Sequence, residues 1–111
     1  LLHLDVNNIY VNSRNFGFDP LSYLHALPLE STCYIHVAGH FVEPDGLLID
    51  THGADVIDPV WSLLDAAYTK IGGEVPTCLE RDFNFPDFSR LTAEVEQIAR
   101  LQAAAGQRKA A

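Results

Sequence analysis

The residues of this sequence that could do chemistry are histidines, carboxylates and an asparagine at or after the ends of apolar, β-branched runs. Imidazole and carboxylate groups together are ligands that iron, manganese and zinc take in proteins. Asp50 and His52 are two residues apart, so both side chains would point the same way in an extended segment. The clustering of such residues predicts a metal centre, and its candidate ligands are Asp5, Asn8, His36, Asp50, His52 and Glu80.

Each of the earlier candidates also has an ordinary structural explanation. Asp5 could cap a turn through its side chain, and Asn8 is a common turn residue. His36 could be a buried histidine whose ring nitrogens are hydrogen-bonded, as most buried polar groups are. These alternatives stay open for each residue taken singly, and the metal centre is favoured only by the group as a whole.

The later candidates can be explained without a metal as well. Asp50 and His52 could bind each other and hold their loop in place. Glu80 could form an ion pair with Arg81 or with Lys70. A seventh residue, His40, follows a glycine that leaves its direction undetermined, so it is the weakest candidate near the site.

The elements that must position these residues repeat three times as strand, polar tip and helix. Apolar and β-branched residues predict strands within "LLHLDVNN", "STCYIHVAGH" and "VPTCLERD". Asp19 and Pro20 predict the start of a helix in "FDPLSYLHALPL", and Asp58 and Pro59 predict another in "IDPVWSLLDAAYTKIGG". A third helix is expected over "DFSRLTAEVEQIARLQAAAG", with an apolar stripe formed by Leu91, Val95, Ile98 and Leu101.

Strands that alternate with helices predict an α/β fold with a parallel sheet and right-handed crossovers. Crossovers of one hand would place all three helices on one face, although parallel sheets are normally covered on both faces. The 111 residues are therefore expected to be one partial domain, three βα units of a larger α/β fold such as a (β/α)8 TIM barrel. Functional residues of such barrels gather at the carboxyl ends of the strands, where the candidates fall. Residues 106–111 are expected to be a frayed tail.

The composition is that of a packed domain, since 48% of the residues are hydrophobic and 20% are charged. The formal net charge of −8 argues against a nucleic-acid surface, which needs clustered Lys and Arg. Some of these acids could instead be cation ligands. No run approaches the ~18 apolar residues of a membrane span, no signal peptide is visible, and neither cysteine belongs to a CxxC pair. We therefore expect a cytoplasmic protein that binds neither nucleic acid nor membrane.

Four stretches, "LDVNNIYVNSRNFGFDP", "IHVAGH", "LLIDTHG" and "LERD", occur in an order and spacing that resemble one family. This is the C-terminal portion of the multinuclear non-haem iron-dependent oxidative enzymes, which include the iron enzyme of methanobactin biosynthesis. More distantly, the chain is similar to xylose isomerase-like barrels, among them the trinuclear zinc endonucleases. In that comparison the chain supplies strands six to eight, and Asn8 replaces a histidine of the endonuclease pattern, which fits the iron family better.

The resemblance implies two or three non-haem irons that use O2 to modify a cysteine of a ribosomally made peptide. It implies that the six candidate ligands hold the metals together with residues from the N-terminal part of the barrel, and that His40 is a catalytic proton donor or outer contact. A partner protein that delivers the peptide is also implied. The alternatives are a hydrolase or isomerase that uses zinc, manganese or another divalent metal on the same barrel, and a non-catalytic, truncated scaffold.

Overall fold

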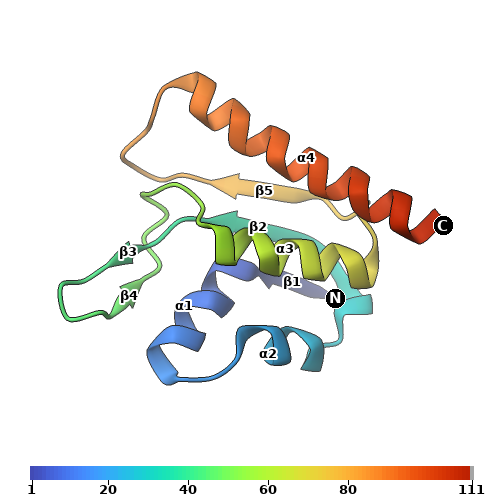
Figure 1. Cartoon of the computed structure of the whole chain (residues 1–111), viewed down its shortest axis with the longest axis horizontal. Coiled ribbons are helices and arrows are strands. Elements are labelled where there is room, and N and C mark those ends of the chain that lie inside the picture. The colour runs from blue at the N-terminus through green and yellow to red at the C-terminus, as the bar shows by residue number, and fades with distance from the viewer. Residues whose placement is uncertain (111) are drawn as a thin grey trace.

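The computed structural model describes residues 1–110, in which strands and helices alternate along the chain (Figure 1). Within this part of the chain, no helix combines the length and the apolar character needed to cross a membrane. The elements in chain order are β1 (Leu2–Asp5), α1 (Val6–Phe16), α2 (Pro20–Ala26), the 3₁₀ turn η1 (Leu29–Ser31), β2 (Thr32–Ala38), β3 (Phe41–Val42), β4 (Leu48–Ile49), α3 (Asp58–Ile71), β5 (Thr77–Glu80) and α4 (Phe88–Ala110).

The main sheet has three parallel strands in the order β1-β2-β5, so the predicted α/β fold with a parallel sheet is confirmed. Its register pairs Asp5 with His36, and Ala38 with Glu80. The three strands therefore end at the same edge of the sheet, and the residues that follow them meet there. This arrangement is that of part of a TIM barrel.

The two faces of the sheet carry different side chains. Leu4, Ile35 and Val37 are at most 1% exposed and pack in one core with residues of the helices. Burial of such side chains contributes about 1.5–3 kcal/mol each and holds the helices on this face. On the other face, His3 and His36 place their rings 4.1 Å apart. The expectation that the helices cover a single face is therefore met.

Helix α1 was not expected, because the residues after Asp5 were interpreted as a loop. Asp5 is instead the N-cap, whose carboxylate accepts a hydrogen bond from the backbone N–H of Asn8 at 2.9 Å. Val6 and Ile9 are buried at helical spacing, and Gly17 ends the helix with a left-handed φ of 75°. The β-branched residues that favour a strand in isolation are held in a helix by this cap and by the core.

The ends of the later helices differ in detail from the prediction. Helix α3 begins at Asp58 itself, so this residue is in the first turn and Ile57 takes the N-cap position without a side-chain hydrogen bond. In α4, Val95 is 54% exposed and Glu94 is buried in its place. The helix continues to Ala110 in the segment where a frayed tail was expected, since Gln107, Arg108 and Lys109 favour a helix in spite of Gly106, and residue 111 lies outside the described part.

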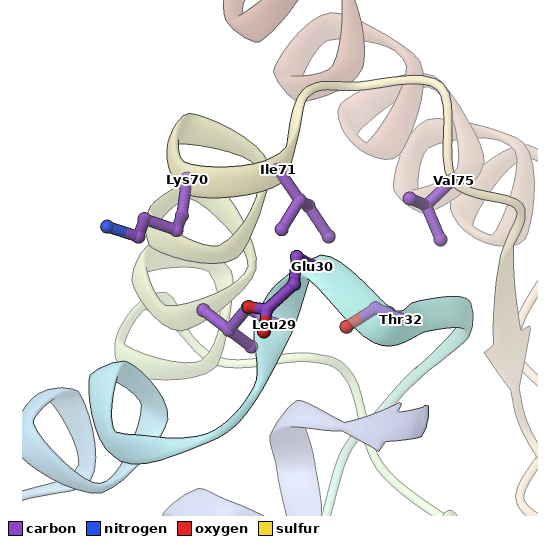
Figure 2. Close-up of a pocket in the computed structure, with 6 residues that line it drawn as sticks. All are labelled: Leu29, Glu30, Thr32, Lys70, Ile71 and Val75. Atoms are coloured by element: carbon purple, nitrogen blue, oxygen red, sulfur yellow. The ribbon is translucent and has the colours of Figure 1, made fainter. Parts of the chain in front are cut away.

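A hollow is present at the amino-terminal end of β2, far along the strand from the residues predicted to act (Figure 2). One carboxylate, one amine and one hydroxyl line it among apolar groups, and they do not form a ligand cluster. The lining residues are Leu29, Glu30, Thr32, Lys70, Ile71 and Val75.

Candidate metal centre

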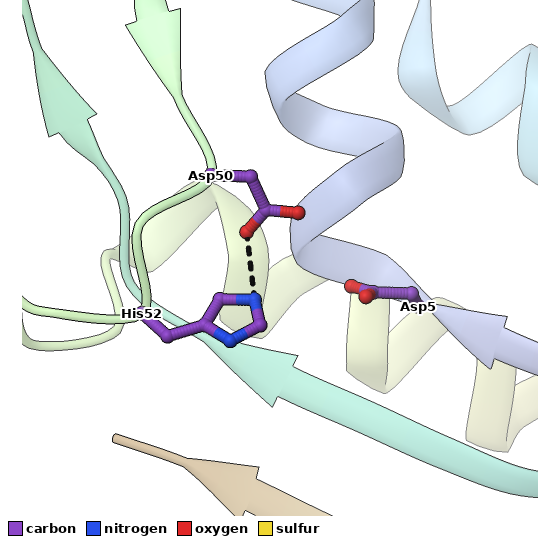
Figure 3. Close-up of side chains that lie close together, drawn as sticks. All are labelled: Asp5, Asp50 and His52. Atoms are coloured by element: carbon purple, nitrogen blue, oxygen red, sulfur yellow. Dashed lines mark ion pairs between the residues drawn. The ribbon is translucent and has the colours of Figure 1, made fainter. Parts of the chain in front are cut away.

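His52 lies at the centre of the carboxyl-end cluster, with an acid near each ring nitrogen. Its Nε2 is 2.9 Å from Oδ1 of Asp50 (Figure 3). Its Nδ1 is 2.9 Å from Oε2 of Glu80 and 3.3 Å from Oδ2 of Asp82. One imidazole thus links the loop after β4 to the end of β5.

Two groups of potential ligands share this histidine. Atoms of Asp5, Asp50 and His52 lie within 4.8 Å of one another, and so do atoms of His52, Glu80 and Asp82. Burial alone would lower the pKa of His52, but the four surrounding carboxylates outweigh it and raise the pKa. A single imidazolium still leaves the cluster with an excess of negative charge, which a bound cation would offset.

The backbone of His52 is held in an uncommon conformation. Its φ is 58°, in the left-handed region that residues other than glycine seldom adopt. Its N–H donates to the carbonyl of Gly39 at 3.2 Å, and its own carbonyl accepts from the N–H of Asp82 at 2.8 Å. A Cβ on Gly39 would lie 2.1 Å from the carbonyl oxygen of Ala54, so only glycine lets the end of β2 approach this loop. Backbone strain of this kind is often found at functional sites.

Asp5 and Asn8 lie beside Asp50 at the start of α1. Burial is the main cause that raises the pKa of Asp5; the N–H of Asn8 lowers it in part, and the charge of Asp50 raises it further. The amide nitrogen of Asn8 lies 3.4 Å from Oδ2 of Asp50, and its amide oxygen accepts a hydrogen bond from Asn12 at 3.1 Å. The helix start therefore brings both predicted residues to the cluster.

Asn7 connects the cluster to His40 and was not predicted. Its amide nitrogen donates to Oδ1 of Asp50 at 2.5 Å and to the carbonyl of Gly39 at 3.1 Å, while its oxygen is 3.0 Å from Nδ1 of His40. His40 is only 7% exposed and its ring packs on Tyr10, so burial lowers its pKa and favours a neutral imidazole. His40 thus contacts the cluster through Asn7. Asp5 could have been recognised in the sequence as the N-cap of a helix, which would have placed Asn7 in the first turn of that helix.

His36 and Asp82 are at the edges of the cluster. Nδ1 of His36 contacts Oε1 of Glu80, but within the described residues His36 belongs to neither ligand group. Asp82 joins a ligand group although it was not predicted, and its side chain is 62% exposed. The sequence "LERD" could have indicated Asp82, because Glu80 and Asp82 are two residues apart. Side chains at that spacing point the same way in a strand.

A second charged group, which we call the arginine clamp, lies beside the cluster. Nη1 of Arg81 is 2.9 Å from Oδ1 of Asp55, and Nη2 of Arg90 is 2.7 Å from Oδ2 of the same residue. Arg81 also donates to the carbonyl of Asn84 at 2.7 Å. These bonds connect the loop before α3, which carries Asp55, to the loop after β5 and to α4. The clamp consists of Asp55, Arg81, Arg90 and Glu94.

The fold and this cluster define a TIM-barrel-type α/β segment with a candidate metal centre at the carboxyl ends of its strands. The chain belongs to the family described as RiPP precursor modification enzyme MbnB/TglH/ChrH, whose family model matches residues 1–103. RiPPs are ribosomally made peptides that are modified after translation. The family resemblance drawn from the four sequence stretches is thereby confirmed.

Curated relatives share more than half of the aligned residues. The chain is 58% identical over 101 residues to a UPF0276 protein of Alcanivorax borkumensis, covering 91% of this chain and 33% of that protein. It is 58% identical over 102 residues to one of Nitrosospira multiformis, covering 92% and 36%. A third, from Neisseria meningitidis serogroup B, is 58% identical over 106 residues, covering 95% and 38%. The chain spans about a third of the length of these relatives.

Proposed function

We propose that this chain supplies part of the metal centre of an iron-dependent enzyme that uses O2 to modify cysteine residues of a ribosomally made peptide. The observation that carries the proposal is the position of His52 between the carboxylates of Asp50, Glu80 and Asp82. Family membership supports the peptide substrate, because the family is described by its action on RiPP precursors.

The donor set fits non-haem iron. Imidazole and carboxylate are the ligand types of non-haem iron oxygenases, whose common triad has two histidines and one carboxylate. Each of the two groups around His52 offers one imidazole and two carboxylates, so a further histidine would be needed to form that triad. His36 and Asn8 lie next to these groups and would complete the ligand set with residues from the N-terminal part of the barrel. We propose as metal ligands Asp5, Asn8, His36, Asp50, His52, Glu80 and Asp82. Zinc or manganese could bind the same donors, so the metal itself must be measured.

When bound, iron would supply the redox chemistry with O2 that amino-acid side chains lack. The chain's own residues would hold and orient the donors. His52 must release a proton from its ring to bind a metal, so the raised pKa of its metal-free state would make metal binding depend on pH. Asn7 fixes one oxygen of Asp50, and His40 fixes Asn7 in turn. We propose that His40 acts through this contact, as a positioning group or a proton donor, and does not bind the metal.

The proposal extends to the partners of the full-length protein. The cysteine of the peptide would have to reach the residues that hold the metal, and a separate protein could deliver the peptide to them. Neither partner is required for the cluster to bind metal, so metal binding and peptide modification can be tested separately.

The test uses the full-length protein prepared without oxygen and supplied with Fe(II). We expect stoichiometric iron, and oxidation of a cysteine-containing precursor peptide only when O2 is admitted, read by mass spectrometry. Protein loaded with zinc or manganese is the matched control and should leave the peptide unchanged. Substoichiometric iron would overturn the proposal. Hydrolysis or isomerisation of a substrate without O2 would favour the divalent-metal alternative.

A further inference from the structure

The small hairpin formed by β3 and β4 is connected at both ends to residues at the candidate metal centre. His40 precedes β3 and Asp50 follows β4, and the pairing joins Phe41 to Ile49 and Val42 to Leu48. The turn at its tip is closed by the N–H of Gly46, which donates to the carbonyl of Glu43 at 2.9 Å. Any chain that pairs with this hairpin would therefore run past the cluster.

The hydrogen bonds of the hairpin show which of its residues face outward. The N–H of Glu43 donates to the carbonyl of Leu47 at 2.8 Å, so these residues form a hydrogen-bonded pair. In an antiparallel ladder the next pair, Val42 and Leu48, directs its N–H and C=O groups away from the partner strand. Each strand of the hairpin thus presents one residue's backbone groups at its outer edge.

The outer edge of β4 is closed by a side chain. The amide of Asn15 donates to the carbonyl of Leu48 at 2.8 Å and accepts from its N–H at 2.9 Å. These two bonds occupy the outward N–H and C=O groups of Leu48, as the backbone of an additional strand would. As a result, β4 cannot accept a peptide without breaking its contact with α1.

The outer edge of β3 is different. Within residues 1–110, β4 is the sole strand paired with β3. The side chains of Phe41 and Val42 are 51% and 53% exposed, so an added strand could cover them. Backbone hydrogen bonds at such an edge would bind an extended peptide whatever its exact sequence.

We propose that the cysteine-containing peptide substrate docks as an extended strand on β3 and pairs its backbone with Val42. This inference rests on the proposed function. Val42 is two residues from His40, and each residue of a strand advances about 3.3 Å, so a docked peptide would pass within a few residues of the cluster. The closed edge of β4 leaves β3 as the only edge of this hairpin for the peptide.

The first measurement is amide hydrogen exchange of the full-length, metal-loaded protein. The N–H of Val42 should exchange quickly in the free protein, because nothing within residues 1–110 pairs with it. Slow exchange in a dilute, monomeric sample would show that another part of the protein covers β3. Protection that appears only at high protein concentration would indicate a second copy. Either result would overturn the proposal.

The second measurement uses peptides selected from a phage-displayed library of short sequences with one fixed cysteine. Val42→Pro removes the outward N–H, and an edge strand tolerates proline at such a position. We expect about tenfold weaker binding of the selected peptides, the loss of roughly 1.4 kcal/mol. The control Val42→Thr keeps the N–H and a β-branched side chain, and should bind like wild type. Equal binding to all three proteins, or failure to select any peptide, would overturn the proposal.

Metal analysis of the same variants separates this inference from the proposed function. Val42→Pro and Val42→Thr should both keep the iron content of the wild type, which shows that the hairpin and the cluster are intact. If iron and O2 chemistry are absent while binding still depends on Val42, the proposed function fails and the docking edge stands. If the chemistry holds and Val42→Pro binds peptides normally, the docking edge fails alone.

Discussion

The candidate metal centre and the arginine clamp are two charged groups on opposite sides of the end of β5, and their charges are balanced differently. In the clamp, Asp55 and Glu94 face two guanidinium groups. In the metal centre, four carboxylates surround His52. The clamp has two acids and two arginines, although Oε1 of Glu94 is buried without a hydrogen-bond partner among the described residues. The metal centre has an excess of negative charge.

The difference arises from three consecutive residues, Glu80, Arg81 and Asp82. Side chains alternate at a strand end, so the two acids point to one side and the arginine to the other. The acids reach His52, while the arginine reaches Asp55. The same short segment therefore builds the proposed ligand set and the support that holds it, and substitutions should separate these two roles.

The largest expected effect is on metal content. In the full-length protein, His52→Ala should lower bound iron at least about tenfold, because changes even to second-shell partners weaken metal binding by 10–100-fold. Folding should be retained, since the side chain belongs to a loop at the top of the strands. Metal analysis and circular dichroism measure the two outcomes. His25→Ala, an exposed histidine on α2, is the control and should keep its iron. Equal iron in both variants would remove His52 from the ligand set.

The next effect is on stability and concerns the clamp. The side chain of Arg81 is 10% exposed, and its removal leaves Oδ1 of Asp55 and the carbonyl of Asn84 without the hydrogen bonds that Arg81 donates. Arg81→Ala should cost about 2–3 kcal/mol of unfolding free energy in the metal-free protein. Arg90→Ala is the matched control; its side chain is 63% exposed, so the cost should be about 0.5 kcal/mol. Urea unfolding measures both, and similar losses would show that the clamp does not depend on the buried arginine.

Much of the fold could be predicted because it depends on local patterns. Three apolar runs predicted three strands, and parallel strands necessarily bring Asp5, His36 and Glu80 to one edge of the sheet. Asp50 and His52 were expected together because an extended segment would align them. They do contact, but the left-handed backbone of His52 brings this about, and that conformation depends on hydrogen bonds to Gly39 and Asp82.

The remainder could not be predicted because it depends on distant partners. The hairpin has two residues in each strand, and one edge is completed by Asn15, which is 33 positions from Leu48. Asn7 was not predicted, because its role depends on helix α1, which places its amide between Asp50 and His40. Sequence spacing identifies residues that extend from the same strand end, but it does not identify side chains that connect different elements.

The smallest expected effect is on the pH dependence of the clamp. The hydrogen bond from Arg81 is the main cause that lowers the pKa of Asp55; burial opposes it, and Arg90 lowers the pKa further. A lowered carboxyl pKa stabilises the fold above the ordinary value near pH 4, and this contribution is lost as pH falls through the lower folded value. Burial raises the pKa of Glu94, so this group has the opposite sign and costs stability as pH rises through its raised value.

Asp55→Asn should therefore flatten the loss of unfolding free energy below about pH 4. Because the charge of Asp55 is one of the causes that raise the pKa of Glu94, the substitution should also lessen, but not remove, the decline in stability at higher pH. Glu94→Gln should do the reverse, removing the decline in stability as pH rises above the ordinary carboxyl range. Urea unfolding of the metal-free proteins at a series of pH values gives both slopes. The metal centre is the same in all three proteins, so its contribution cancels when each variant is subtracted from wild type. Parallel curves for wild type and Asp55→Asn would show that the ion pairs of Asp55 with the two arginines contribute nothing to stability, and the contrast between the two charged groups would then rest on the metal centre alone.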